Sequence, residues 1–365
     1  MALQRCDKME NYWSPSNRFD NLTVCKAWII VALVMLAIVY GLVVYHPIIQ
    51  DAGDSSLKNT DLKLYRRIVE RIHTGESYYT AAEDELRKRG YTTHSPFNWR
   101  LPSLAWLLGY LPDVNIGRIL VVMLASINLL VWMTVFRQYQ YSLVQVTLGS
   151  FTMAGPLIYS LLPDPFLGHE HWAGTLIALS LAAYGRGWRA LSLISGLCAL
   201  FLRELSLPFV CVMMVIAYLE RRRWESIVWL LGIIVFVGAL MFHWSIVTHS
   251  FTERNTALGG EWIVFGGWQF VLGTAQMYPW LLIAPPWVTA ITLPLALLGL
   301  ARWYGQLGSR VAATVGIYIL AFSMIGLPYN KYWGSMYVHL MPLGFLFTNY
   351  ALRDLWQPIC RKVVK

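Results

Sequence analysis

Long apolar runs separated by short polar connectors organise the whole chain. The first run, AWIIVALVMLAIVYGLVVY at 27–45, is close to the roughly 20 residues that a helix needs to cross a bilayer. Nine more runs follow, at 115–136, 143–162, 172–184, 190–202, 207–219, 227–247, 285–301, 311–328 and 337–352. This pattern predicts an all-α polytopic membrane protein, with about ten transmembrane helices in a single integral-membrane domain that covers 1–365.

The basic residues predict which way these helices run, because short cytoplasmic loops are enriched in Lys and Arg. The polar stretch 1–26 precedes a run long enough to stay in the membrane, which does not fit a cleaved signal peptide. Ten crossings would place both termini in the cytoplasm together with every basic connector. These connectors are Arg137, Arg186 with Arg189, 221–223, Arg302 with Arg310, and the tail 353–365.

The stretch 190–219 is too long for one span and too short for two full ones. Basic clusters flank it on the same predicted side, and Arg203-Glu204 interrupts its middle. We predict two short helices that meet in a polar turn within a protein-lined cavity, where irregular backbone is tolerated. The stretch 248–284 is also irregular, and a re-entrant segment is expected there.

The extracytoplasmic loop 46–112 is the one large polar insertion in the sequence, and its pattern predicts helices. Apolar residues recur at helical spacing in 61–73, opposite charged ones, as in an amphipathic helix that can lie at the membrane surface. A second helix is expected to begin with a Thr80–Glu83 capping box. Its expected i,i+4 ion pairs are Glu83–Arg87, Asp84–Lys88 and Glu85–Arg89. The aromatic run 99–110 is too short to span and suits the membrane interface.

Composition supports the membrane prediction and excludes several functions. The chain is 57% hydrophobic and only 13% charged, with a formal net charge of +9. Because most Lys and Arg lie in short loops and termini, orientation and lipid headgroups explain them better than nucleic-acid binding. The five cysteines form no CxxC pair, and no Walker A, GxGxxG or GxSxG motif occurs, so a zinc site and a nucleotide-driven machine are not indicated.

Charged residues near the ends of the spans are the candidates for chemistry, because polar groups in a membrane are costly and are usually functional. The strongest candidates all fall on the predicted extracytoplasmic side. They are Asp51, Asp54, Asp61, Arg100, His169, Glu170, His171, Arg203, Glu204 and Lys331. Such a convergence is what an active site at the membrane surface needs.

Each candidate also has a structural interpretation. Asp61 opens the predicted 61–73 helix, where it could act as a general base or simply favour the helix dipole. Asp51 and Asp54 could bind a metal, although Asp-Ala-Gly-Asp is more simply a solvated turn. His169-Glu170-His171 lacks the HExxH spacing of a zinc site, which favours hydrogen bonding or substrate contact over a metal.

Arg203 and Glu204 are adjacent, so on a helix their side chains should diverge and each should need another partner. The planar guanidinium of Arg203 suits a phosphate group, and Glu204 could orient a neighbouring residue. The structural alternative is a pair that links other helices.

The arrangement resembles the GT-C superfamily of integral-membrane glycosyltransferases, with a closer likeness to compact bacterial polyprenol-phosphate-mannose-dependent (family 87-like) enzymes. The feature shared with these enzymes is a large loop directly after the first span, in which an acidic residue begins an amphipathic helix. The motifs lie in about 27–350 and are Asp61-Leu-Lys-Leu-Tyr65, Gly75-Glu-Ser-Tyr-Tyr79, Phe97-Asn-Trp-Arg-Leu-Pro102, Glu170-His-Trp-Ala-Gly174, Phe201-Leu-Arg-Glu-Leu-Ser-Leu-Pro208 and Lys331-Tyr-Trp-Gly334.

The resemblance implies a polyprenyl-phosphate-linked sugar donor from the bilayer and a glycan, lipid or protein hydroxyl acceptor, in a multi-pass protein of the bacterial inner membrane. It matches Asp61 to the general base, and it suggests Arg203, Arg100 and Lys331, in falling order, for the donor phosphate. The full expected site adds Glu170 and Glu204 as catalytic residues and Tyr65, His169 and His171 as substrate contacts.

Two points stay open in this interpretation. Relatives carry a paired acidic motif in the first loop, which this chain lacks. The requirement for a divalent metal therefore stays open, and so does the choice of the base among Asp51, Asp54 and Asp61. No resident cofactor is expected. A transporter or flippase is the competing class, since broken helices and intramembrane charges suit it as well. A third possible class is a non-catalytic assembly partner of a polysaccharide system.

Overall fold

The computed structural model describes residues 18–19, 22–45, 52–91, 93, 96–139, 142–249 and 264–363, and every regular element in these ranges is helical. The elements are α2 (Val24–Val44), α3 (Ala52–His73), α4 (Tyr78–Lys88), α5 (Pro96–Trp99), α6 (Ser103–Gly109), α7 (Ile116–Gln138), α8 (Leu143–Met153), α9 (Gly155–Ser160), η1 (Pro165–Leu167), α10 (His169–Gly185), α11 (Arg189–Leu202), η2 (Glu204–Ser206), α12 (Leu207–Leu219), α13 (Arg223–His249), α14 (Gly267–Ala275), α15 (Pro279–Leu282), α16 (Pro286–Arg302), α17 (Gln306–Met324), η3 (Pro328–Met336) and α18 (Met341–Val363). Asp51 lies outside the described residues, and so does the side chain of Asp54.

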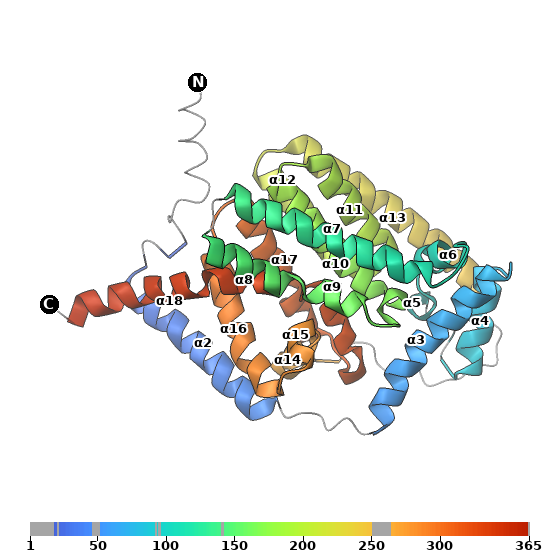
Figure 1. Ribbon diagram of the computed structural model, residues 1–365, viewed down its shortest axis with the longest axis horizontal. Helices are drawn as coiled ribbons and strands as arrows, with labels where there is room; N and C mark the ends of the chain where they lie inside the picture. The colour runs from blue at the N-terminus through green and yellow to red at the C-terminus, as the bar shows by residue number, and fades with distance from the viewer. Residues whose placement is uncertain are drawn as a thin grey trace.

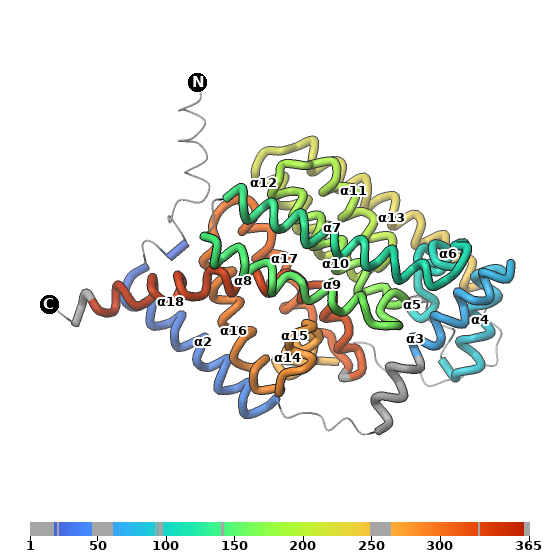
Figure 2. The backbone as a smooth tube through the Cα atoms, in the orientation of Figure 1, coloured from blue at the N-terminus to red at the C-terminus, as the bar shows by residue number. Residues whose placement is uncertain are grey.

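Four of these helices are long and apolar enough to cross a membrane, namely α2, α7, α13 and α17. Shorter apolar helices cover 189–202, 204–219 and 286–302. Each of the ten apolar runs of the sequence contains helix, and 143–162 is divided between α8 and α9. The structure is therefore that of a helical membrane protein, in which α2, α16 and α18 pack together at one side (Figure 2).

The basic connectors meet at one end of the helices, which we call the arginine end. Arg189, at the start of α11, and Arg310, in α17, lie 3.5 Å and 3.9 Å from the ring centre of Tyr184, at the end of α10. Arg222, after α12, lies 6.0 Å from the same ring. Three connectors distant in sequence therefore share one end, as their charges predicted.

The hairpin predicted for 190–219 is present as α11 and α12. Arg203 leaves the helix with an extended backbone, φ −150° and ψ 117°, and η2 completes the turn. Tyr318 of α17 donates a hydrogen bond of 2.8 Å to the carbonyl oxygen of Leu205, and Ser206 caps the carbonyl of Ala199 at 3.0 Å. The polar turn is thus held by its own side chains and by a neighbouring helix.

The first loop folds into a helical layer, α3 to α6, on the opposite side of the molecule from α2 and α18 (Figure 1). The apolar face of α3, which includes Leu64, Ile68 and Ile72, is buried against α4 and α6 and does not face the membrane as predicted. The reason is that the aromatic run 99–110 supplies a protein surface for it: Trp99 and Leu104 are buried in the same core.

Two helix starts differ from the prediction. α3 begins at Ala52, so Asp61 lies in the middle of the helix and not in its first turn, where the dipole would act on it. The N-cap of α4 is Ser77, whose side chain accepts a hydrogen bond from the amide of Thr80, so the predicted capping box at Thr80 is wrong. Both residues are good N-caps, but the helix begins at Tyr78, so Ser77 caps it and Thr80 lies inside its first turn.

The predicted ion pairs of α4 are present in two cases out of three. Glu83 pairs with Arg87 at 2.5 Å, and Glu85 pairs with Arg89. Asp84, in contrast, pairs with Arg71 of α3 at 2.8 Å. The tertiary partner replaces the local one because α3 lies directly against α4.

A close approach at Gly174 joins η3 to α10. A Cβ at this position would overlap the carbonyl oxygen of Ser335, so only glycine lets the two backbones meet. This contact matters for the site, since η3 carries Tyr332 and α10 carries His169 and Glu170. In the irregular region, α14 and α15 are both too short to span, and a re-entrant path remains the expectation there.

Candidate active site

A chain of buried ion pairs lies where the first loop meets the α11–α12 turn. Arg203 Nε lies 2.7 Å from Glu170 Oε1, and Arg203 also pairs with Glu204. Glu204 continues the chain to Arg100, with its Oε1 3.7 Å from Arg100 Nη1. These four residues are among the ten candidates expected on one side of the membrane, and they come from the loop before α6, from α10 and from the turn.

The expectation that Arg203 and Glu204 diverge is wrong. It assumed a helix, in which neighbouring side chains point about 100° apart. Because the backbone at Arg203 is extended, the two side chains can meet. Arg203 is therefore not an arginine without a partner: it is 1% exposed and has a carboxylate on each side.

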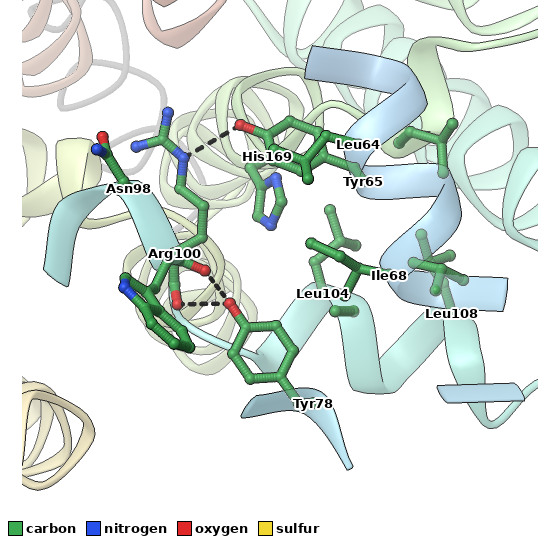
Figure 3. Close-up of a pocket in the computed structure, with 13 residues that line it drawn as sticks. Leu64, Tyr65, Ile68, Tyr78, Asn98, Arg100, Leu104, Leu108 and His169 are labelled. Atoms are coloured by element: carbon green, nitrogen blue, oxygen red, sulfur yellow. Dashed lines mark hydrogen bonds between the residues drawn. The ribbon is translucent and has the colours of Figure 1, made fainter. Parts of the chain in front are cut away.

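Arg100 is held less tightly than Arg203. Its backbone has φ 60°, which is uncommon outside glycine and is often found at functional sites. Its guanidinium donates to the hydroxyls of Tyr65 at 3.3 Å and Tyr332 at 3.5 Å, both long bonds. Figure 3 shows the guanidinium reaching towards Tyr65, while the Tyr78 hydroxyl points to the carbonyl oxygens of Trp99 and Arg100 and fixes the strained turn.

Arg100, Tyr65 and His169 line a small cavity whose other walls are mainly apolar, with Ile68, Leu104 and Leu108 among them (Figure 3). Its volume of about 20 Å³ has room for one water molecule. A larger substrate would therefore need the first loop to move relative to α10. His169 completes the polar wall, with its ring 5.0 Å from that of Tyr65 in an edge-to-face arrangement.

Asp61 lies one helical turn before Tyr65 and accepts a hydrogen bond from the hydroxyl of Tyr91. Burial raises the pKa of the Asp61 carboxyl above its usual value of 3.8. The Tyr91 hydrogen bond and the charge of Arg100 lower this pKa, and the charge of Glu170 raises it. Asp61 is thus electrostatically coupled to the ion-pair chain without being neutralised by a direct pair in the described residues.

His171 belongs to a different cluster, although it follows Glu170 directly. Its Nε2 lies 2.7 Å from Ser160 Oγ, and its ring lies 5.5 Å from that of His339. Two positions along a helix turn a side chain by about 200°, which sends His171 away from His169. The structure therefore does not bring this predicted substrate contact to the site.

Lys331 lies in η3 with its Cβ close to Gly273 of α14, and it is its neighbour Tyr332 that reaches Arg100. Tyr332 and Tyr91 are site residues that sequence reasoning missed. Tyr332 lies within the motif Lys331-Tyr-Trp-Gly334, so a signal was present there. For Tyr91 nothing in the local pattern pointed to Asp61, which is 30 residues earlier.

The site has more acidic than basic groups, with Asp61, Glu170 and Glu204 against Arg100 and Arg203. In the described part of the chain, no group of three or more His, Cys, Asp or Glu residues is placed to hold a metal ion. A phosphate group could bind here only by taking a guanidinium from its present partner. Arg100 is the better candidate of the two, because its distance to Glu204 is longer than those of the Arg203 ion pairs and it lies at the cavity wall beside the hydroxyls of Tyr65 and Tyr332.

Comparisons with protein-family models, curated proteins and solved structures found no significant match to this chain.

Proposed function

We propose that the protein is a glycosyltransferase that moves a sugar from a polyprenyl-phosphate-linked donor to a hydroxyl acceptor. The observation that carries the proposal is the position of Asp61: a partly buried carboxylate whose pKa the charge of Arg100 lowers, one helical turn before Tyr65, which lines the cavity. A base and a phosphate-binding cation side by side are what sugar transfer from a lipid phosphate needs.

In the proposed reaction, the acceptor oxygen attacks the anomeric carbon of the sugar as Asp61 takes the hydroxyl proton. The new carbon–oxygen bond forms as the bond between the anomeric carbon and the phosphate oxygen breaks. The electron pair of that bond leaves with the polyprenyl phosphate, whose charge Arg100 stabilises. Phosphate is already a competent leaving group, so positioning and charge stabilisation provide most of the catalysis.

Arg100 replaces Arg203 as the first candidate for the donor phosphate. Arg203 is held by Glu170 and Glu204, and removing it would leave the buried carboxylate of Glu170 unpaired. Arg100 lies 3.7 Å from Glu204, a longer distance than either ion pair of Arg203, and it lies at the cavity wall. In this scheme Glu170 and Arg203 position Glu204, and Glu204 holds Arg100 until the phosphate arrives.

We also propose how the protein lies in the membrane, on the basis of the charges in its sequence. The arginine end would lie in the cytoplasm with both termini, and the site would open to the extracytoplasmic side of a bacterial inner membrane after ten crossings. A glycan, lipid or protein hydroxyl would be the acceptor. A metal-independent reaction fits the ion-pair chain, since Arg100 supplies the positive charge.

The test replaces Asp61 by Asn in the full chain. Asn keeps the size and can still accept the Tyr91 hydrogen bond, but it cannot accept a proton at neutral pH. Sugar transfer should fall by about 10²–10⁴-fold, with donor binding and melting temperature preserved. Asp164→Asn, a half-exposed acidic residue paired with Arg66, is the control and should keep full activity. Near-normal transfer by Asp61→Asn would contradict the proposal.

A further inference from the structure

The arginine end contains more positive charge than its carboxylates can balance. Arg310 forms a bidentate pair with Glu220, at 2.7 Å and 2.9 Å, and Arg222 lies 3.3 Å from the same carboxylate. Glu225 is also within 4 Å of both arginines. These two carboxylates are therefore fully used by Arg222 and Arg310.

Arg189 is one of the arginines at this end that have no counter-charge among the described residues. Among the described residues no carboxylate pairs with it, and its Nη1 is buried without a hydrogen-bond partner. Its guanidinium stacks on Tyr184 at 3.5 Å, which fixes its position. In the same tight connection between α10 and α11, Arg186 hydrogen-bonds to Gln138 but its Nε is also buried without a partner. Buried donors of this kind need an acceptor.

Two further features indicate where that acceptor comes from. No side chain caps α11, which begins at Arg189, so the amides of its first turn also favour an anion. Around this end, Trp188, Tyr218 and Trp224 are 44%, 67% and 77% exposed, as aromatic residues at a membrane interface would be. A phosphate at the depth of the lipid headgroups would meet these donors.

We infer that Arg189 and Arg186, with the start of α11, form a phosphate-binding site at the arginine end, remote from the proposed active site. Its ligand is the phosphate of an anionic lipid headgroup in the surrounding leaflet. Basic pockets between helices at the cytoplasmic side of a membrane are a known form of lipid site. Because α10 runs from this connection to His169 and Glu170, the bound phosphate would also steady the helix that supports the active site.

The experiment titrates the full chain, in neutral detergent, with short-chain phosphatidylglycerol, with the matching phosphatidylcholine and with inorganic phosphate, and follows the melting temperature. Wild type should be stabilised by phosphatidylglycerol and not by phosphatidylcholine. Arg189→Gln should weaken the apparent affinity for phosphatidylglycerol by about 10- to 100-fold, the usual effect of losing a charge-assisted hydrogen-bond pair. Arg186→Gln should have a smaller effect in the same direction.

The control is Arg137→Gln, which removes an exposed arginine at the same end and should bind like wild type. If Arg189→Gln melts too low in phosphatidylcholine for a titration, Arg189→Lys keeps the charge and should lose affinity through the missing planar fork. Equal, Arg189-dependent stabilisation by inorganic phosphate would keep the site and identify a soluble ligand. Equal binding of phosphatidylglycerol by wild type, Arg189→Gln and Arg189→Lys would overturn the inference.

Discussion

Arg100 and Arg203 belong to one ion-pair chain, but their surroundings give them different roles. Arg203 is 1% exposed between two carboxylates, while Arg100 faces a cavity through long contacts. The first arrangement stabilises the fold around the turn, and the second places a cation at the wall of the cavity. Two variants separate these roles.

Replacing Arg203 by Gln should unfold the protein at a markedly lower temperature. It leaves the buried carboxylate of Glu170 without its cation, and breaking a buried pair on one side costs about 3–5 kcal/mol. The comparison is Arg66→Gln, whose pair with Asp164 at 3.0 Å is half exposed and is worth about 0.2–1 kcal/mol. Equal melting temperatures for the two variants would show that Arg203 is not structural.

Replacing Arg100 by Gln or by Lys should instead weaken donor binding, with little change in melting temperature. The loss of a charge-assisted phosphate contact corresponds to about 1.5–3 kcal/mol, or roughly 10- to 100-fold in Kd. Arg67, which is exposed on α3, provides the control variant Arg67→Gln. Unchanged donor affinity in both Arg100 variants would remove this residue from the proposed site.

The Asp61–Tyr91 pair gives a pH dependence with a definite sign. Since a base works only when deprotonated, sugar transfer should fall as the pH drops through the raised pKa of Asp61, above the usual 3.8. Tyr91→Phe removes a hydrogen bond that favours the carboxylate, so the acid limb of the profile should move to still higher pH. Tyr110→Phe, at an exposed tyrosine, should leave the profile unchanged. A shift to lower pH in Tyr91→Phe would contradict the assignment.

The same pKa shift predicts how Asp61 affects stability. A carboxyl whose pKa is higher in the folded state favours folding while protonated, and this contribution disappears as the pH rises through the folded-state pKa. At neutral pH the partly buried charge of Asp61 therefore lowers the stability of the fold, and Asp61→Asn should melt at or above the wild-type temperature. A dipole-stabilising Asp in a first turn would instead have made this variant less stable by about 0.3–1 kcal/mol.

At the scale of elements, the contact of η3 with α10 is the one that positions Tyr332 beside Arg100. Gly174→Ala should destabilise the fold by about 1–3 kcal/mol, because the added Cβ meets backbone, which cannot turn aside. It should also weaken donor binding by displacing Tyr332. Gly316→Ala on α17 adds a methyl group in open space and should be neutral or slightly stabilising. Equal melting temperatures for the two variants would contradict the close contact.

The elements that could be predicted from the sequence are those set by local pattern. The ten apolar runs all contain helix, and the hairpin at Arg203 followed from a polar interruption between flanking arginines. The start of α3 could not be predicted, since 52–60 has no apolar periodicity. Nor could the choice of Ser77 over Thr80, because both are good N-cap residues and only the packing of α4 on α3 selects between them.

The contacts of the candidate site, like the helix starts, could be predicted only in part. Charge and position in the sequence placed ten candidates on one side of the membrane, and the structure brings Arg100, Glu170, Arg203 and Glu204 of these into one chain of ion pairs. The pairing within the group depended on one extended residue, and the roles of Tyr91 and Tyr332 depended on contacts between distant segments. Contacts between distant segments cannot be predicted from hydrophobic periodicity, because that pattern reports only on neighbouring residues.

At the scale of the whole molecule, the orientation in the membrane follows from the two ends of the structure. Single cysteines at Lys88, on α4, and at Arg137, at the arginine end, are both exposed positions. In a background without the five natural cysteines, an impermeant reagent should label position 88 but not 137 in intact cells. Labelling of position 137 alone, or of both, would contradict the proposed orientation.

The central claim is that the protein cleaves a lipid-linked sugar rather than moving it across the membrane. The most direct measurement uses the purified full chain in liposomes with a hydroxyl acceptor and polyprenyl-phosphate sugars labelled in the sugar, and follows sugar transfer and donor translocation together. We predict that wild type moves the label to the acceptor and releases polyprenyl phosphate, and that Asp61→Asn does neither. Translocation of the intact donor without cleavage, to the same extent in wild type and Asp61→Asn, would contradict the account and favour a flippase.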